Sequence, residues 1–201
     1  MTFHEITAVP LSEDDKTRPP SASLRYQELA DLYAGIPQIA DATQQRPRPT
    51  ESTYDFMWRL RRSETPEDGI TLTAFAFTPK IAIWWGHECL RTMPEALTAA
   101  DHHFMQGVAR WLGDPSRENR HTLMREALWT QDRVPGMHLA LAVGWAGGAI
   151  APNDPSSPPL FRCPRAVNTA VLSCLAQAAP GRRQIYFAHF MDVAQSLFRV
   201  Y

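Results

Sequence analysis

Four side chains with chemical or binding potential share one face of a helix predicted over residues 79–93. Trp84, His87, Glu88 and Arg91 stand at i, i+3, i+4 and i+7, opposite an apolar sector. A histidine beside a glutamate could transfer protons, whereas tryptophan and arginine are favoured anchors in protein interfaces. Trp84 could also pack beneath a neighbouring helix or a proline-rich loop. We assign no catalytic residue and expect packing or partner binding at this face.

The run Asp101-His102-His103 raises the question of a metal site. On a predicted helix over 94–113, adjacent histidines point about 100° apart, whereas chelation from one helix face needs i, i+4 spacing. The sequence contains no His-Glu-x-x-His and no Cys-x-x-Cys. We therefore expect His102 and His103 to face solvent, and we predict no metal and no cofactor.

Two further ionisable side chains are predicted to serve packing. Asp101 falls within an apolar stripe, so its carboxylate must be paired or hydrogen-bonded, and we expect an arginine from an adjacent helix as its partner. His138 lies in the first turn of a small-residue helix. Burial and the helix N-terminus both favour its neutral form.

Charge and motifs give little support to nucleic-acid or nucleotide binding. The net charge is −1, so no bulk field attracts polyanions. No Gly-x-x-x-x-Gly-Lys occurs, and the glycines at 144–148 end a helix, which is the wrong end for phosphate. Arg110, Arg117, Arg120 and Arg125 form only a weak basic patch without interleaved aromatic residues.

The pattern of apolar residues and breakers predicts an all-α protein, an antiparallel array or bundle of about six to eight helices. Prolines and glycines punctuate successive helices from residue 79 onward. A helix from Pro135 to Gly147-Gly148 is small and apolar on every side, which is typical of a central helix. Segments 54–62 and 66–76 are less regular, since Ile70-Thr71-Leu72-Thr73 alternates as a strand would.

The chain divides into three parts. Residues 1–20 read as a flexible lead, 21–53 as a short helix plus a proline-containing linker, and 54–201 as the helical domain. Within that domain the proline-rich stretch 149–163 is predicted to be a loop, and loops of this length are functional or disordered. We add its Asn153 and Asp154 to the candidate partner-binding residues.

The cysteine count and hydropathy indicate a compartment. Three cysteines without paired spacing argue for a reducing environment. The N-terminus lacks a secretory pattern, and no stretch reaches the roughly 18 apolar residues that a membrane span requires. We expect a cytoplasmic protein that does not insert into membranes.

Two stretches together resemble a known group of proteins. The first is Ala82–Arg91, and the second is Leu141–Pro152 with its proline-rich run and then Arg165–Val171. They are similar to a bacterial helical family of unknown function associated with type VI secretion gene clusters, over roughly residues 66–198. The shared features are packing motifs: a Trp pair, a Trp followed by small residues, and proline-rich punctuation. The resemblance implies an adaptor, chaperone or accessory role in the secretion apparatus, and it carries over no catalytic residue.

We therefore expect a non-enzymatic binding protein whose partner is another protein, and the resemblance implies a secretion-system component or effector. One alternative is a small hydrolase or metal-assisted enzyme that uses His87 and Glu88, with Asp101 and a histidine from elsewhere, in a site assembled by folding. Another is an immunity protein, with which acidic residues at 13–15 and 64–68 are compatible. The sequence leaves the oligomeric state open.

Overall fold

The computed structural model describes residues 23–151, 153–154 and 156–198. Within them the chain forms ten α-helices, a 3-10 turn and isolated β-bridges, which confirms the all-α prediction. The predicted lead over residues 1–20 lies outside the described residues. In chain order the elements are α1 (Leu29–Gly35), α2 (Gln38–Ala42), α3 (Thr53–Arg61), α4 (Glu67–Ala76), α5 (Pro79–Arg91), the 3-10 turn Pro94–Ala96, α6 (Ala99–Gly113), α7 (Arg117–Trp129), α8 (Pro135–Gly144), α9 (Arg162–Ala176) and α10 (Pro180–Phe198).

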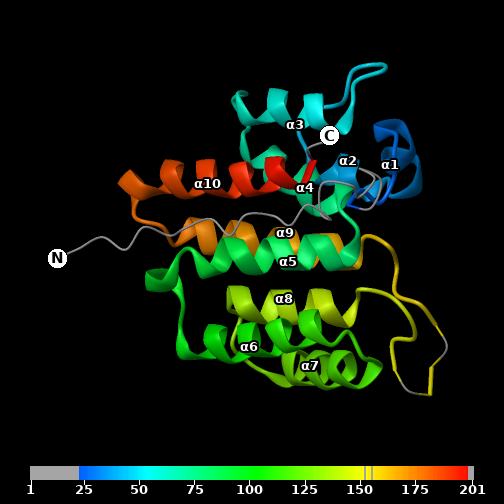
Figure 1. Cartoon of the computed structure of the whole chain (residues 1–201), viewed down its shortest axis with the longest axis vertical. Helices are drawn as coiled ribbons and strands as arrows, with labels where there is room; N and C mark the ends of the chain where they lie inside the picture. The colour runs from blue at the N-terminus through cyan, green and yellow to red at the C-terminus, as the bar shows by residue number, and fades with distance from the viewer. Residues whose placement is uncertain (1–22, 152, 155, 199–201) are drawn as a thin grey trace, which may run out of the picture.

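The helices stack along the long axis of the molecule (Figure 1). Helices α6, α7 and α8 form one end, α5 and α9 lie in the middle, and α4 and α10 lead to α1, α2 and α3 at the other end. Helix α8 packs against α5, α6, α7 and α9, while α9 also packs against α4 and α5. Helices α8 and α9 therefore connect the two ends through one continuous core.

The small-residue helix is central, as predicted. In α8 every residue from Pro135 to Gly144 is buried except the half-buried His138. Helix α8 ends through Trp145, and Gly147 and Gly148 follow with φ angles of 141° and 73°. These positive angles strain any residue with a side chain, which explains the two glycines.

The ambiguous segment 66–76 is helical. Helix α4 is buried on nearly all sides, so its sequence lacks the one-sided periodicity by which surface helices are recognised. Its threonines fit because their hydroxyls bond inside the protein: Thr73 Oγ1 donates to Gly69 O at 2.7 Å, and Thr71 Oγ1 to Asn168 Oδ1 on α9 at 3.2 Å.

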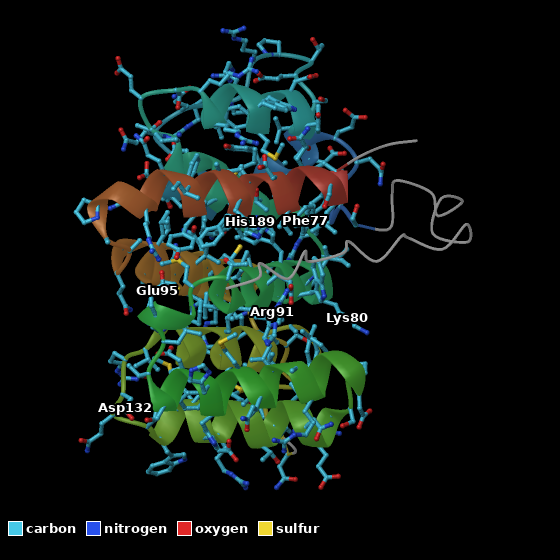
Figure 2. All side chains as sticks on the ribbon, turned by 60° about the vertical axis from the view of Figure 1, so that its left-hand side comes forward. Phe77, Lys80, Arg91, Glu95, Asp132 and His189 are labelled. Carbon is cyan, nitrogen blue, oxygen red and sulfur yellow. The ribbon has the colours of Figure 1, made fainter. Side chains whose placement is uncertain are left out.

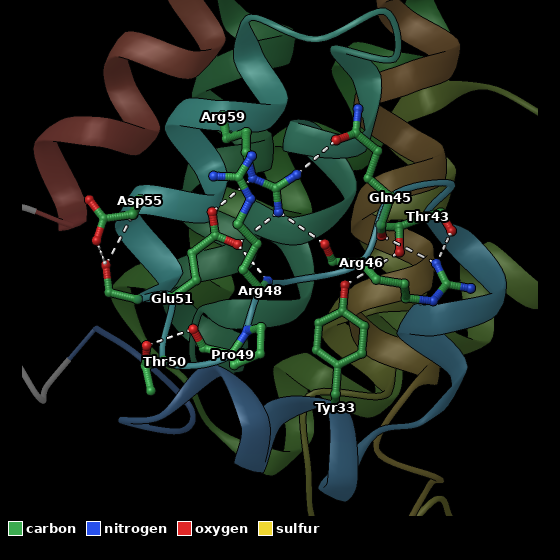
Figure 3. A network of polar contacts seen from close by, with 11 residues as sticks. Tyr33, Thr43, Gln45, Arg46, Arg48, Pro49, Thr50, Glu51, Asp55 and Arg59 are labelled. Carbon is green, nitrogen blue, oxygen red and sulfur yellow. Dashed lines mark hydrogen bonds and ion pairs between the residues drawn. The ribbon is translucent and has the colours of Figure 1, made fainter.

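The segment before α3 packs onto the helical body. Leu32, Ile36 and Ile39 are buried in the shared core, and an isolated bridge joins Leu24 to Phe77. The proline-containing connection at 43–52 is held by Arg59, which bonds both Glu51 oxygens at 2.8 and 2.7 Å (Figure 3).

The same guanidinium also reaches Gln45 Oε1 at 3.0 Å and Arg46 O at 2.9 Å. The hydrogen bond from Arg59 outweighs burial and lowers the pKa of Glu51 below its ordinary value. A further carboxylate, that of the buried Asp68, accepts the backbone N–H groups of Gln44 and Gln45. The connection therefore has a defined path over the surface of the helical body.

The environment of Asp101 corrects two expectations. Helix α6 begins at Ala99, not at Pro94, because Thr98 and Asp101 form a capping box in which each side chain accepts the other's backbone N–H. The carboxylate is fully buried, and its partners are Thr98 and the backbone of Gly136. The prediction of an arginine partner was therefore wrong.

Over the described residues, no helix is both long and apolar enough to cross a membrane.

Candidate protein-binding surface

Helix α5 presents the predicted polar face because its opposite side is committed to the core. Pro79 occupies the first turn, where its missing N–H costs nothing. Ala82, Trp85 and Cys89 are buried, and the Trp85 indole Nε1 donates to Phe190 O on α10 at 3.0 Å. This anchoring fixes the rotation of the helix and thereby exposes the other side.

The four predicted residues differ in how far they reach solvent. The Trp84 residue is 39% exposed, and the side chain of Arg91 is 64% exposed (Figure 2). His87 and Glu88 are more covered, with side-chain exposures of 14% and 21%. The prediction that these residues share one face therefore holds, and Trp84 and Arg91 are its accessible members. We call these four residues the α5 face.

The ionisable groups of the α5 face are already paired with one another. Arg91 Nε and Nη2 donate to Glu88 Oε2 at 3.0 and 2.6 Å, and His87 Nδ1 lies 3.4 Å from Glu88 Oε1. Burial alone would raise the pKa of Glu88, but hydrogen bonding and charge from Arg91, assisted by His87, hold it below its ordinary value. Glu88 is thus an ionised acceptor, which suits a fixed surface pattern better than proton donation near neutral pH.

Asn153 and Asp154 lie exposed in the proline-rich loop, which projects from the side of the molecule between α8 and α9 (Figure 1). Asp154 Oδ1 accepts the Ser156 N–H at 2.9 Å, and bonding to Ser156 lowers the pKa of Asp154. Helix α7 holds the start of the loop, because Arg120 Nη2 donates to Ala149 O at 2.9 Å and His121 Nε2 lies 3.1 Å from the same oxygen. Among the described residues, no hydrogen bond or ion pair connects this loop to the α5 face.

A family model covers most of this architecture. The model of a family of unknown function, DUF6931, matches residues 56–198. The chain belongs to this family. The matched region begins within α3 and includes the α5 face, the proline-rich loop and α10, whereas α1 and α2 precede it. No curated protein and no solved structure has significant similarity to the chain.

Within the DUF6931 region, the two histidines that follow Asp101 lie on a different side of α6 from its carboxylate. His102 and His103 are exposed, as expected, and His103 Nε2 lies 3.4 Å from Glu126 Oε2 on α7. Asp101 faces inward to cap α6. Across the described residues, no three His, Cys, Asp or Glu side chains gather as a metal-binding group.

Sequence reasoning missed the most exposed aromatic side chain in the described structure. Trp129, the last residue of α7, is 83% exposed, and its neighbour Leu128 is 55% exposed. The available signal was the position of this apolar pair, directly before the polar run Thr130-Gln131-Asp132-Arg133. Periodicity alone could not show that no other helix covers it.

Proposed function

We propose that this DUF6931 protein is a non-enzymatic protein-binding module, an adaptor, chaperone or accessory protein, that contacts its partner through the α5 face. The observation that supports this proposal best is Trp84, a tryptophan that is 39% exposed in the middle of a polar stripe. Tryptophan and arginine dominate the binding energy of many interfaces because they bury a large area with few flexible bonds. Trp84 supplies that area, and Arg91 supplies directional donors beside it.

The pairing within the α5 face supports recognition over catalysis. Glu88 is held by Arg91 and His87, so the stripe offers a fixed arrangement of charge around Trp84. Fixed groups lose little conformational entropy when a partner binds. A hydrolytic role for His87 and Glu88 would instead require that one of them can give up or take up a proton during the reaction.

We further propose that the partner belongs to a type VI secretion system. The support is the resemblance of the segments around Trp84, Trp145 and Arg165 to a helical family that accompanies such gene clusters. The gene neighbourhood gives an independent check. Repeated proximity of close relatives' genes to secretion genes would support this assignment, and consistent placement in biosynthetic operons would contradict it.

The experiment is affinity capture with a matched pair of double variants. Trp84→Ala with Arg91→Ala removes one exposed apolar side chain and one ion-paired arginine from α5. The control, Ile185→Ala with Arg182→Ala, removes the same two features from α10, where Ile185 is 66% exposed and Arg182 pairs with Glu95. Circular dichroism establishes that both variants fold.

Quantitative mass spectrometry measures how much partner each protein captures. We expect wild type and the α10 control to capture similar amounts, and the α5 variant to capture at least about tenfold less. An unchanged partner set for the folded α5 variant would refute the role of the α5 face. Stoichiometric zinc or manganese in the purified protein would favour the metal-assisted alternative instead.

A further inference from the structure

A second surface feature lies on α7, at the opposite end of the molecule from α3. A hollow of about 440 Å³ opens between α7 and the first residues of the proline-rich loop. Most of its exposed lining is apolar. We call it the α7 hollow, and the residues that line it are Glu118, His121, Thr122, Met124, Arg125, Leu128, Trp129, Ile150 and Ala151.

The apolar part of the α7 hollow is unusually open to water. Trp129 and Leu128 are 83% and 55% exposed, side by side at the end of α7. Exposed apolar surface costs free energy that burial against a partner recovers. Neighbouring exposed aromatic and aliphatic side chains at the edge of a concavity are typical of an interaction site.

The electrostatic character of the α7 hollow comes from a buried arginine beside it. Arg120 is only 7% exposed, and its guanidinium contacts Gly144 O, Gly147 O, Ala149 O and the His121 ring. These contacts satisfy carbonyls at and after the C-terminal end of α8, but none is with a carboxylate. Burial and the charge of Arg117 lower the pKa of Arg120.

One further arginine lines the wall of the α7 hollow. Arg125 is exposed on α7, and Glu118 is the one acidic residue in the lining. With Arg120 beneath, positive charge exceeds negative charge here although the net charge of the whole chain is −1. An excess of positive charge next to an apolar concavity complements a ligand that combines carboxylates with one apolar side chain.

We propose that the α7 hollow binds an acidic peptide segment of another protein, anchored by one aromatic or aliphatic side chain. The anchor lies between Leu128, Trp129 and Ile150, and flanking carboxylates face Arg125. This site shares no residue with the α5 face and does not depend on the function proposed for it. Each surface can therefore fail its own test without affecting the other.

The test begins with a displayed library of random 12-residue peptides, selected on the intact full-length protein. Enriched peptides are then synthesised with a fluorophore, and their affinity is measured by fluorescence anisotropy. We expect them to carry one large apolar residue with two or more Asp or Glu nearby. Their affinity should fall at least about tenfold for Trp129→Ala and for Arg125→Glu, and it should weaken as salt rises.

The matched control is the double variant Ile185→Ala with Arg182→Ala on α10, outside both proposed surfaces, which should bind these peptides as wild type does. Because Trp129 and Arg125 are exposed, both α7 variants should fold, and circular dichroism checks this. The proposal is overturned if selection enriches no peptide or only neutral and basic ones, or if the α7 variants bind unchanged. A concentration-dependent dimer that Trp129→Ala abolishes would also overturn it, because a second copy of the chain would then cover the hollow.

Discussion

The carboxylate of Asp101 accepts a hydrogen bond from the backbone N–H of Gly136 at 2.7 Å, which joins the N-terminal turns of α6 and α8. Its second oxygen, Oδ2, accepts from the backbone and hydroxyl of Thr98 at 2.9 and 2.7 Å. Each N-terminal turn has unpaired N–H groups and a partial positive charge. One buried anion therefore satisfies two helix starts.

Replacing this anion should be among the more destabilising single changes in the chain. Asp101→Ala leaves the buried N–H of Gly136 and the N–H of Thr98 without their acceptors, and we expect a loss of about 2–4 kcal/mol in the free energy of unfolding. Urea denaturation followed by circular dichroism measures it. Asp132→Ala, which removes an exposed carboxylate after α7, serves as the control and should change stability by less than about 0.5 kcal/mol. Equal effects of the two changes would contradict the bridging role of Asp101.

The close approach of α6 and α8 at this point also requires a glycine. A Cβ at position 136 would lie 2.8 Å from Asp101 O and 2.9 Å from Asp101 Cα, both backbone atoms that cannot rotate away. We expect Gly136→Ala to destabilise the fold by about 1–3 kcal/mol. Gly113→Ala at the end of α6 meets no atom within 4 Å, so it should be neutral or stabilise by up to about 1 kcal/mol. Thermal denaturation of the two variants gives the comparison, and a stable Gly136→Ala protein would show that the helices can separate at little cost.

The half-buried His138 should make the fold sensitive to mild acid. Burial, with help from the charge of Arg133, lowers the pKa of His138 below 6.5. As pH falls below 6.5, the unfolded chain takes up a proton at this position before the folded chain does, so stability falls with pH until the folded pKa is passed. We expect urea denaturation at pH 7.5 and 5.5 to show a smaller acid loss for His138→Gln than for wild type. His102→Gln, on the exposed side of α6, should keep the full loss, and identical pH profiles for wild type and His138→Gln would refute the assignment.

The sequence predicts the helical class and the central position of α8 because both depend on local patterns. A run of small apolar residues between Pro135 and Gly147 indicates a helix that is covered on all sides, whatever covers it. The α5 face is predictable for the same reason, since residues at i, i+3, i+4 and i+7 share a side of any helix. Helix α4 was harder to assign because full burial removes the one-sided pattern.

Features that depend on tertiary placement could not be predicted in this way. Thr98-x-x-Asp101 is a local capping signal, but the proline at 94 suggested an earlier helix start and hid it. Nothing local to Asp101 indicates that Gly136 supplies its other partner, 35 residues away. In the same way, the sequence shows Arg120 only as one of several arginines, and the fold places backbone carbonyls at the end of α8 around it. The exposure of Trp129 likewise depends on which helices pack nearby.

The cysteines give a last prediction, because their chemistry is set by burial. Cys89, Cys163 and Cys174 are all buried and free. Desolvation raises the pKa of Cys163 and of Cys174 to about 12, and in Cys163 it outweighs the nearby charge of Arg25. Only the thiolate reacts with a disulfide reagent, so native protein at pH 8 should be labelled far more slowly by 5,5′-dithiobis(2-nitrobenzoic acid) than protein in urea, where all three thiols should react. Gln184→Cys, on the exposed side of α10, supplies a matched accessible thiol that should react fast in the native state. Rapid labelling of the native wild type would mean that α5 and α9 open readily and that the core described here is not closed in solution.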